Sequence, residues 1–285
     1  MSILGFVLVL TAAFCHATWN FFVKRLNAGA ELVWLFSVVA AVIYAPLALY
    51  VASGTDGLDR LQILFVLGSV AIHLGYFLLL QTGYRHGALS VVYPTARSTG
   101  PLLATCFAVL LLGETVTVQT VLGGATIIFG VLMLTGGFQR GGGSRALISV
   151  LFGVAAGLLI GSYTAWDAYA VSVLLVPPLL LDYASSIGRV VLLAPVALRR
   201  RQAVARLWTQ HRKEVVIIAI FCPLAYLLVL VAMTFTPVIY VAPLREVSVL
   251  LSVLMGSVLL GEGHLRPRLF WSTIIVFGVA ALALG

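Results

Sequence analysis

The chain has 285 residues, of which 62% are apolar and only 9% are charged, and its mean hydropathy is +1.13. A soluble domain is about half apolar and about a quarter charged, so this composition excludes a water-soluble globular fold. The formal net charge of +8 comes mostly from short stretches between apolar runs, where basic residues indicate membrane orientation and not nucleic-acid binding. Because a helix needs roughly 20 residues to cross a bilayer, the chain has room for about ten spans and for no separate catalytic domain.

Ten apolar runs, separated by polar breaks, predict an all-α polytopic membrane protein with ten transmembrane helices. In chain order the predicted spans are 3–23, 31–53, 61–84, 88–112, 117–136, 146–170, 174–198, 214–236, 238–260 and 268–285. The first run is too long for the apolar part of a signal peptide, so we expect it to remain as a span. The three cysteines are odd in number and lie inside apolar runs, which predicts no disulfide framework. We expect neither a metal nor a cofactor.

The two halves of the chain repeat each other. Leu112-Gly113-Glu114 recurs as Leu260-Gly261-Glu262, and Trp19-Asn20 recurs as Trp166-Asp167. Further recurrences, all at offsets between 147 and 150 residues, are Thr126-Ile127-Ile128 with Thr273-Ile274-Ile275, Gly130 with Gly278, Ala45-Pro46 with Ala194-Pro195, and Tyr76 with Tyr226. The prediction is two five-helix repeats, residues 1–140 and 145–285. Because five is odd, the second repeat is inverted, an arrangement typical of secondary transporters with a site at the repeat interface.

Basic residues divide unequally between the two sets of predicted loops. Thirteen lysines and arginines fall on one side of the membrane and only Arg60 falls on the other. The thirteen are Lys24, Arg25, Arg85, Arg140, Arg145, Arg199, Arg200, Arg201, Arg206, Arg212, Lys213, Arg266 and Arg268. The positive-inside rule therefore places these loops in the cytoplasm, and both termini outside, in a cell (inner or plasma) membrane. The basic segment 199–213 also contains Leu207 and Trp208, so both a plain orientation signal and a contact with the anionic leaflet are open.

The glycine-rich motifs resemble a known family. Leu112-Gly113-Glu114 followed by Gly123-Gly124 and Gly130-Val131, and Leu260-Gly261-Glu262 followed by Gly278-Val279, are similar to the paired signature of EamA-type transporters of the drug/metabolite transporter (DMT) superfamily. The resemblance covers both halves. It implies a central cavity lined by helices one to four and six to nine, with the fifth and tenth peripheral. Ten-helix relatives are often drawn with cytoplasmic termini, whereas the charges here favour external ones.

Ionisable residues inside spans are costly and usually mark a transport pathway. Arg97 and Arg245 are repeat equivalents at an offset of 148. Each lies roughly 10–14 Å into its span at 1.5 Å per residue, and the two enter from opposite faces. We therefore expect them to converge at the midplane, where two guanidinium forks suit a carboxylate or a phosphate.

Residues near the two arginines complete this first candidate site. Tyr93 lies one helical turn before Arg97, and Tyr240 and Glu246 lie close to Arg245. Three prolines interrupt the same two spans and are candidate hinges: Pro94, Pro101 and Pro243. An alternative remains open, because the spans contain as many acids as arginines and a pair such as Arg97 with Glu246 could be structural or gating. The acids are Asp167, Asp182 and Glu246, and the third arginine is Arg189.

A second candidate site combines aromatic and polar side chains at helical spacing. His16, Trp19 and Asn20 are mirrored, at an offset of 147, by Tyr163, Trp166 and Asp167. Each trio falls on roughly one helix face and could hold an apolar or cationic group, although an interfacial aromatic belt explains it equally.

The third predicted helix carries His73, Tyr76 and Tyr84, and Tyr226 is the counterpart of Tyr76. His73 is either a packing residue or a candidate proton relay that would couple transport to protons.

Two further patterns have structural readings. Gly153, Gly157 and Gly161 form overlapping GxxxG steps, which predict close helix packing. Glu114 and Glu262 lie at predicted helix ends, where we expect capping or loop fixing.

The function that these patterns favour is a secondary transporter, and not an enzyme, that moves a small organic metabolite by alternating access. An amino acid, a related zwitterion or an organic anion fits the arginines best. A quaternary ammonium or aromatic drug-like compound is the alternative substrate, and an intramembrane lipid-modifying enzyme or a channel is the alternative class. No recognisable nucleotide-binding loop, HExxH motif or Ser/His/Asp cluster occurs in the sequence. The sequence leaves open the direction of transport, the coupling ion and the oligomeric state.

Overall fold

The computed structural model describes residues 1–26, 28–55, 57–86, 89–134, 144–259 and 265–284. In these ranges the chain forms eleven α-helices and no strand. They are α1 (Ile3–Leu26), α2 (Ala30–Ser53), α3 (Arg60–His86), α4 (Leu89–Leu112), α5 (Val118–Leu134), α6 (Ser144–Ser172), α7 (Pro178–Arg199), α8 (Arg201–Met233), α9 (Val238–Arg245), α10 (Val247–Leu259) and α11 (Leu265–Leu284). Six of the described helices are long and apolar enough to cross a membrane, and the predicted count of ten spans in two repeats stays a prediction.

The predicted span 238–260 consists of two helices, α9 and α10, in keeping with the interruption expected from Pro243. Pro243 has no backbone N–H, so it cannot donate to the carbonyl four residues earlier. The N–H of Glu246 then bonds the Pro243 carbonyl at 3.0 Å, a tight turn of three residues, before α10 begins. By contrast, α4 is one continuous helix through Pro94 and Pro101, so these two prolines do not interrupt it as predicted.

The segment 199–213 is largely helical and is not the loop that we predicted. α8 begins at Arg201 and has non-helical backbone angles at His211 (φ −132°, ψ 29°), where it bends. Val204 and Leu207, three residues apart, pack against a buried cluster that includes Leu32 and Ile218. This apolar face explains why the segment folds against α2 despite its many arginines.

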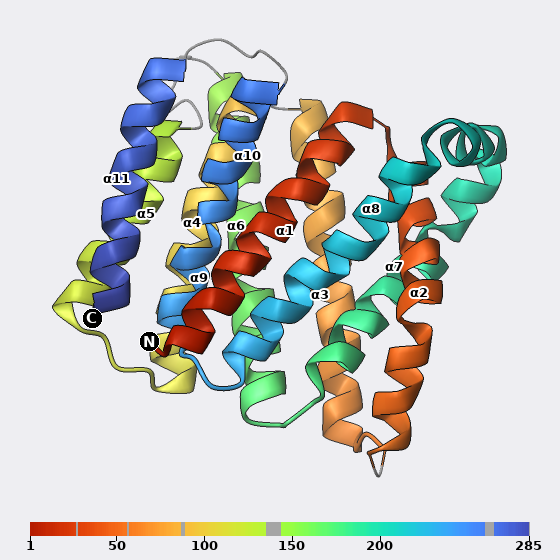
Figure 1. The fold of residues 1–285 in the computed structure, drawn as a ribbon, viewed down its shortest axis with the longest axis horizontal. Coiled ribbons are helices and arrows are strands. Elements are labelled where there is room, and N and C mark those ends of the chain that lie inside the picture. Colours follow the sequence, from red (N-terminus) through yellow and green to blue (C-terminus); the bar gives the residue numbers. More distant parts are fainter. Residues whose placement is uncertain (27, 56, 87–88, 135–143, 260–264, 285) are drawn as a thin grey trace.

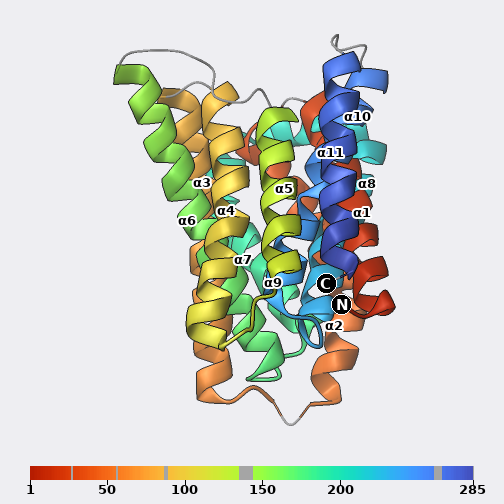
Figure 2. The same ribbon diagram turned by 90° about the vertical axis from the view of Figure 1, so that its left-hand side faces the viewer.

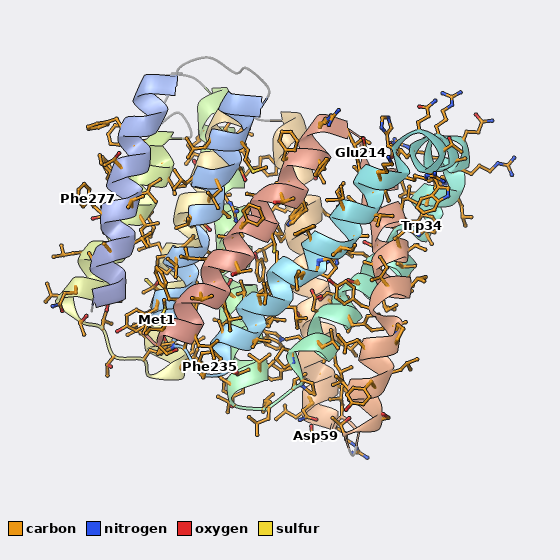
Figure 3. All side chains as sticks on the ribbon, viewed as in Figure 1. Met1, Trp34, Asp59, Glu214, Phe235 and Phe277 are labelled. Carbon is orange, nitrogen blue, oxygen red and sulfur yellow. The ribbon has the colours of Figure 1, made fainter. Side chains whose placement is uncertain are left out.

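The helices lie side by side, with both termini at one end (Figure 1, and from the side in Figure 2). The turn at Asp59 lies at the same end as Met1, whereas Glu214 lies at the opposite end (Figure 3). α5 pairs with α11 at one edge of the molecule, and α2 pairs with α7 at the other.

Equivalent residues of the two halves contact each other reciprocally at the α5–α11 edge. A Cβ on Gly130 would lie 2.6 Å from Cγ1 of Ile275, and one on Gly278 would lie 2.9 Å from Cγ1 of Ile127. Both positions therefore require the smallest side chain so that the two helices can approach closely.

The predicted roles of the GxxxG glycines and of Glu114 are confirmed. Cβ atoms on Gly153, Gly157 and Gly161 would lie 2.6–2.8 Å from side chains of α4, so these glycines seat α6 directly on α4. The Glu114 carboxylate accepts from the N–H groups of Val238 (2.8 Å) and Ile239 (2.9 Å), and so caps α9. Glu262 lies outside the described residues.

Candidate substrate cavity

A cavity of about 120 Å³ lies where α1, α3, α4 and α6 to α10 meet. Its walls are Ala12, Ala13, His16, Trp19, His73, Arg97, Tyr163, Asp182, Arg189, Cys222, Ala225, Tyr226, Val229, Arg245 and Ser248. Three arginines and an aspartate in so small a space are unusual for the interior of an apolar bundle. The cavity is therefore the candidate functional site.

Arg97 reaches this cavity and is also held by internal contacts. Its Nε lies 3.5 Å from Oε2 of Glu246, and its Nη2 donates to Nε2 of His16 at 3.2 Å. Arg97 is 8% exposed and Glu246 is 3% exposed, so this is a buried ion pair that joins the two halves. Because a guanidinium only donates, Nε2 of His16 must accept, which places the proton of a neutral imidazole on Nδ1.

Arg245 reaches the same cavity with a different set of neighbours. Its guanidinium carbon lies 5.6 Å from the ring centroid of Tyr226, within cation–π range. Among the described residues, no hydrogen bond or ion pair holds this guanidinium. Its five N–H donors are therefore available to an anionic ligand or to water.

The sequence explains the difference between the two arginines. Arg97 is followed by Ser98, whereas its repeat equivalent Arg245 is followed by Glu246. The second repeat thus supplies the carboxylate that pairs with Arg97, and the first repeat has no acid at the matching position. Sequence reasoning identified both arginines but did not use this asymmetry.

Asp167, beside the cavity, binds two neighbouring side chains. His73 Nε2 donates to Asp167 Oδ2 at 2.9 Å, and the Tyr226 hydroxyl donates to the same oxygen. The His73 ring stacks on Tyr163 with centroids 4.0 Å apart. This network fixes the orientation of His73, Tyr163 and Tyr226, which all line the cavity.

Sequence reasoning did not place Asp182 and Arg189 in the site. They lie seven residues apart on α7, and so on one helix face. Arg189 donates to Ser186 Oγ (2.9 Å) and to Ser37 Oγ of α2 (3.3 Å), both neutral groups. Asp182 is 4% exposed, and no hydrogen bond or ion pair reaches its carboxylate in the part of the chain that the structure describes. Their spacing within an apolar span was the signal that could have identified them.

Trp166 lies away from the cavity, although its repeat equivalent Trp19 lines it. The indole of Trp166 donates to the Phe65 carbonyl at 2.8 Å and stacks on the Phe65 ring. It lines a separate groove of about 470 Å³ with residues of α3, α4 and α6. The predicted face fails because Trp166 packs on α3, against Gly68 and Phe65, whereas Tyr163 on the same helix reaches the cavity.

Of the remaining predicted residues, Tyr76 and Tyr240 pack against buried apolar clusters and are not among the described cavity walls. Pro101 and Pro243 are buried. The side chains of Tyr93 and Pro94 lie outside what the structure describes. The cavity thus brings together Arg97, Arg245, His16, Trp19 and Tyr226 from the predicted set.

The fold and the comparisons agree on the class of protein. Several apolar helices around a polar cavity define a multi-pass membrane protein. Residues 3–136 match the model of the EamA-like transporter family. One solved crystal structure superposes with a TM-score of 0.75 over 98% of each chain at 17% identity, a likeness that shows the fold of the whole chain.

This match assigns residues 3–136 to the EamA-like transporter family, which is part of the DMT superfamily. The predicted resemblance is therefore confirmed. Members of this family are membrane transporters of small substrates, and nothing supports the alternative of a lipid-modifying enzyme.

Proposed function

We propose that this protein is a secondary transporter of an amino acid or a related zwitterion or organic anion, which it carries through the central cavity by alternating access. Arg245 is the observation that carries the proposal. A guanidinium in a membrane interior is costly unless it finds a partner, and among the described residues no hydrogen bond or ion pair holds Arg245, which lies over the Tyr226 ring. A substrate carboxylate would supply two charge-assisted hydrogen bonds.

Asp182 supports a zwitterion over a simple anion. Its carboxylate lines the same cavity as Arg245 and has no hydrogen-bond or ion-pair partner among the described residues. An ammonium group at Asp182 and a carboxylate at Arg245 would neutralise both charges at once. A buried charge is stable only when it is paired and hydrogen-bonded.

A quaternary ammonium or aromatic drug-like compound is the second candidate substrate. His16, Trp19, Tyr163 and Tyr226 give the cavity aromatic walls suited to such a cation. The volume of about 120 Å³ argues for a smaller solute, because pockets for drug-sized ligands measure about 300–1,000 Å³.

Alternating access in the proposal rests on an inverted repeat. In the two repeats α1 is equivalent to α6, α2 to α7 and α3 to α8. The contacts respect this equivalence: α3 packs on α6 as α8 packs on α1, and α3 packs on α7 as α8 packs on α2. Together with the reciprocal Gly130 and Gly278 contacts, these pairings support two structurally equivalent halves. We place the moving element at the break between α9 and α10, where Pro243 already interrupts the helix.

Proton coupling would use the His73–Asp167 pair. Tyr163, Tyr226 and Asp182 are the other titratable groups beside it on the elements packed around α3. Uptake driven by a pH gradient in proteoliposomes should be lost in His73→Gln while exchange without a gradient persists.

The substrate proposal is tested by binding to purified protein. Thermal-shift titrations use a panel of amino acids, their deaminated acids and their decarboxylated amines. Arg245→Gln should weaken the binding of amino acids and acids by about 10- to 150-fold, the loss of one charge-assisted contact of about 1.5–3 kcal/mol. Arg245→Lys should recover only part of this loss, because lysine restores the charge without the fork.

Two further variants complete the test. Asp182→Asn should weaken binding of the amines and amino acids but not of the matched acids. Arg60→Gln, on an exposed side chain at the start of α3, is the matched control and should bind as the wild type does. Wild-type affinity in Arg245→Gln would remove Arg245 as a ligand and leave the aromatic walls as the candidate site.

A further inference from the structure

A second polar site lies at the end of the molecule opposite the two termini. The short helical segment of α8 before His211 is seen end-on in Figure 1, whereas most of the other helices run along the plane of the picture. The segment therefore lies across the bundle. Its exposed face is basic, and the nitrogen-tipped side chains around it project outward in Figure 3.

This segment and the adjoining ends of α2 and α7 form a groove of about 740 Å³. Its walls are Ala28, Glu31, Arg199, Arg200, Arg201, Gln202, Ala203, Arg206, Leu207, Gln210 and His211. Four arginines face one acid, which leaves a formal charge of +3 on the groove when His211 is neutral. The groove therefore attracts anions.

The single acid is already used. Glu31 pairs with Arg200 at 3.0 Å and accepts from the N–H of Gly29 at 3.2 Å, and it is largely buried. No ion pair or hydrogen bond holds the side chains of Arg199, Arg201 or Arg206 in the ranges that the structure describes. Three guanidinium groups thus border one groove without an internal counter-ion. Guanidinium forks match phosphate oxygens in geometry as well as in charge.

The surroundings indicate a lipid rather than a soluble anion. Leu198, the residue before Arg199, is 73% exposed, and Val191, two turns earlier on the same face of α7, is 63% exposed. This apolar strip ends where the basic groove begins. Trp208, also exposed, lies on the same α8 segment, and such a ring suits the headgroup level of a bilayer.

We propose that this groove binds the phosphate of an anionic phospholipid, with the acyl chains along Val191 and Leu198. The bound headgroup would seat the α8 segment on the leaflet. The site is independent of the substrate cavity, because none of its walls is shared with it.

The test uses the purified full chain in detergent and native mass spectrometry with dioleoyl-phosphatidylglycerol, dioleoyl-phosphatidylcholine and inorganic phosphate as separate probes. Phosphatidylglycerol should bind at least tenfold more tightly than phosphatidylcholine. Arg201→Gln/Arg206→Gln should abolish this preference. Arg212→Gln/Lys213→Gln is the matched control: it removes the same charge from exposed side chains next to the groove and should keep most of the preference.

Each contrary result overturns the proposal. Equal losses in the two double variants would mean diffuse electrostatics without a site. Equal binding of the two lipids would mean that the headgroup is not recognised, and displacement of phosphatidylglycerol by inorganic phosphate at equal concentration would mean a site for the free ion. Arg201→Lys/Arg206→Lys keeps the charges and should retain part of the preference for phosphatidylglycerol. This result would show that the glutamine variant loses guanidinium contacts and is not simply misfolded in this segment.

Discussion

Trp19 and Trp166 occupy equivalent positions in the two halves, yet their surroundings differ. The indole N–H of Trp166 donates to the Phe65 carbonyl, and the indole stacks on the Phe65 ring. The indole also packs directly on Gly68, where a Cβ would lie 2.5 Å from it. Trp19 faces the cavity edge-on to His16, and its buried Nε1 has no hydrogen-bond partner among the described residues. One indole is fixed by the protein, and the other has an N–H left for a ligand or water.

The helices that bear these tryptophans explain the contrast. At the offset of 147 that aligns the two tryptophans, the α6 glycines Gly157 and Gly161 correspond to Leu10 and Phe14 of α1. Glycine lets α6 lie directly on α4, whereas α1 carries the larger side chains of Leu10 and Phe14 at the matching positions. A duplicated sequence therefore predicts two equal faces, but side-chain volume at these two positions allows only α6 to approach its neighbour this closely. The following predictions test this asymmetry, in order of expected effect.

The largest effect should come from the Arg97–Glu246 ion pair, whose carboxylate is present only in the second repeat. Glu246→Gln leaves the buried Arg97 guanidinium without its carboxylate and should lower the free energy of unfolding by about 3–5 kcal/mol. The double variant Arg97→Gln/Glu246→Gln should cost less than the sum of the two single variants, because neither charge is left alone. Denaturant unfolding in detergent measures all three. Additive losses would show that the contact is not energetically coupled.

The glycines of α6 should show the next largest effect. Gly157→Ala places a Cβ 2.7 Å from Thr99 Cβ, so α4 and α6 must separate, at a cost of about 1–3 kcal/mol in overpacking. Gly75→Ala on α3 is the control, since its Cβ would meet only Leu159 at 3.9 Å. The same thermal shift in both variants would mean that glycine flexibility, and not close packing, matters at Gly157.

The helical class, the family and most helix positions could be predicted from the sequence, because hydropathy and the repeat are properties of whole segments. Glu114 and the α6 glycines were also predictable, since capping and close packing depend on local spacing. The neighbours of Trp166 could not be predicted. A rotation of the helix about its axis by less than the roughly 100° between consecutive residues decides which helix the indole contacts. Asp182 was missed because a charge near paired prolines does not reveal which helices will surround it.

In the second repeat, where the protein itself holds the indole, Trp166→Phe removes one buried hydrogen bond and leaves the Phe65 carbonyl without its donor. We expect a loss of about 0.5–1.5 kcal/mol in the free energy of unfolding. Ligand affinity should be unchanged, because Trp166 lies outside the cavity. A large loss of affinity with unchanged stability would reverse the roles assigned to the two tryptophans.

Trp19→Phe is the counterpart on the cavity side and should have the smallest effect on stability. It removes an N–H that has no partner among the described residues, so the free energy of unfolding should stay within about 0.5 kcal/mol or rise, because an unsatisfied donor is costly to bury. Binding should respond differently. If a substrate oxygen accepts from this N–H, the amino-acid ligand that stabilises the wild type should bind about tenfold more weakly, which corresponds to about 1.4 kcal/mol. Isothermal titration of the two phenylalanine variants with that ligand decides the matter: a loss confined to Trp19→Phe supports the asymmetry, and equal affinities would place the ligand away from both indoles.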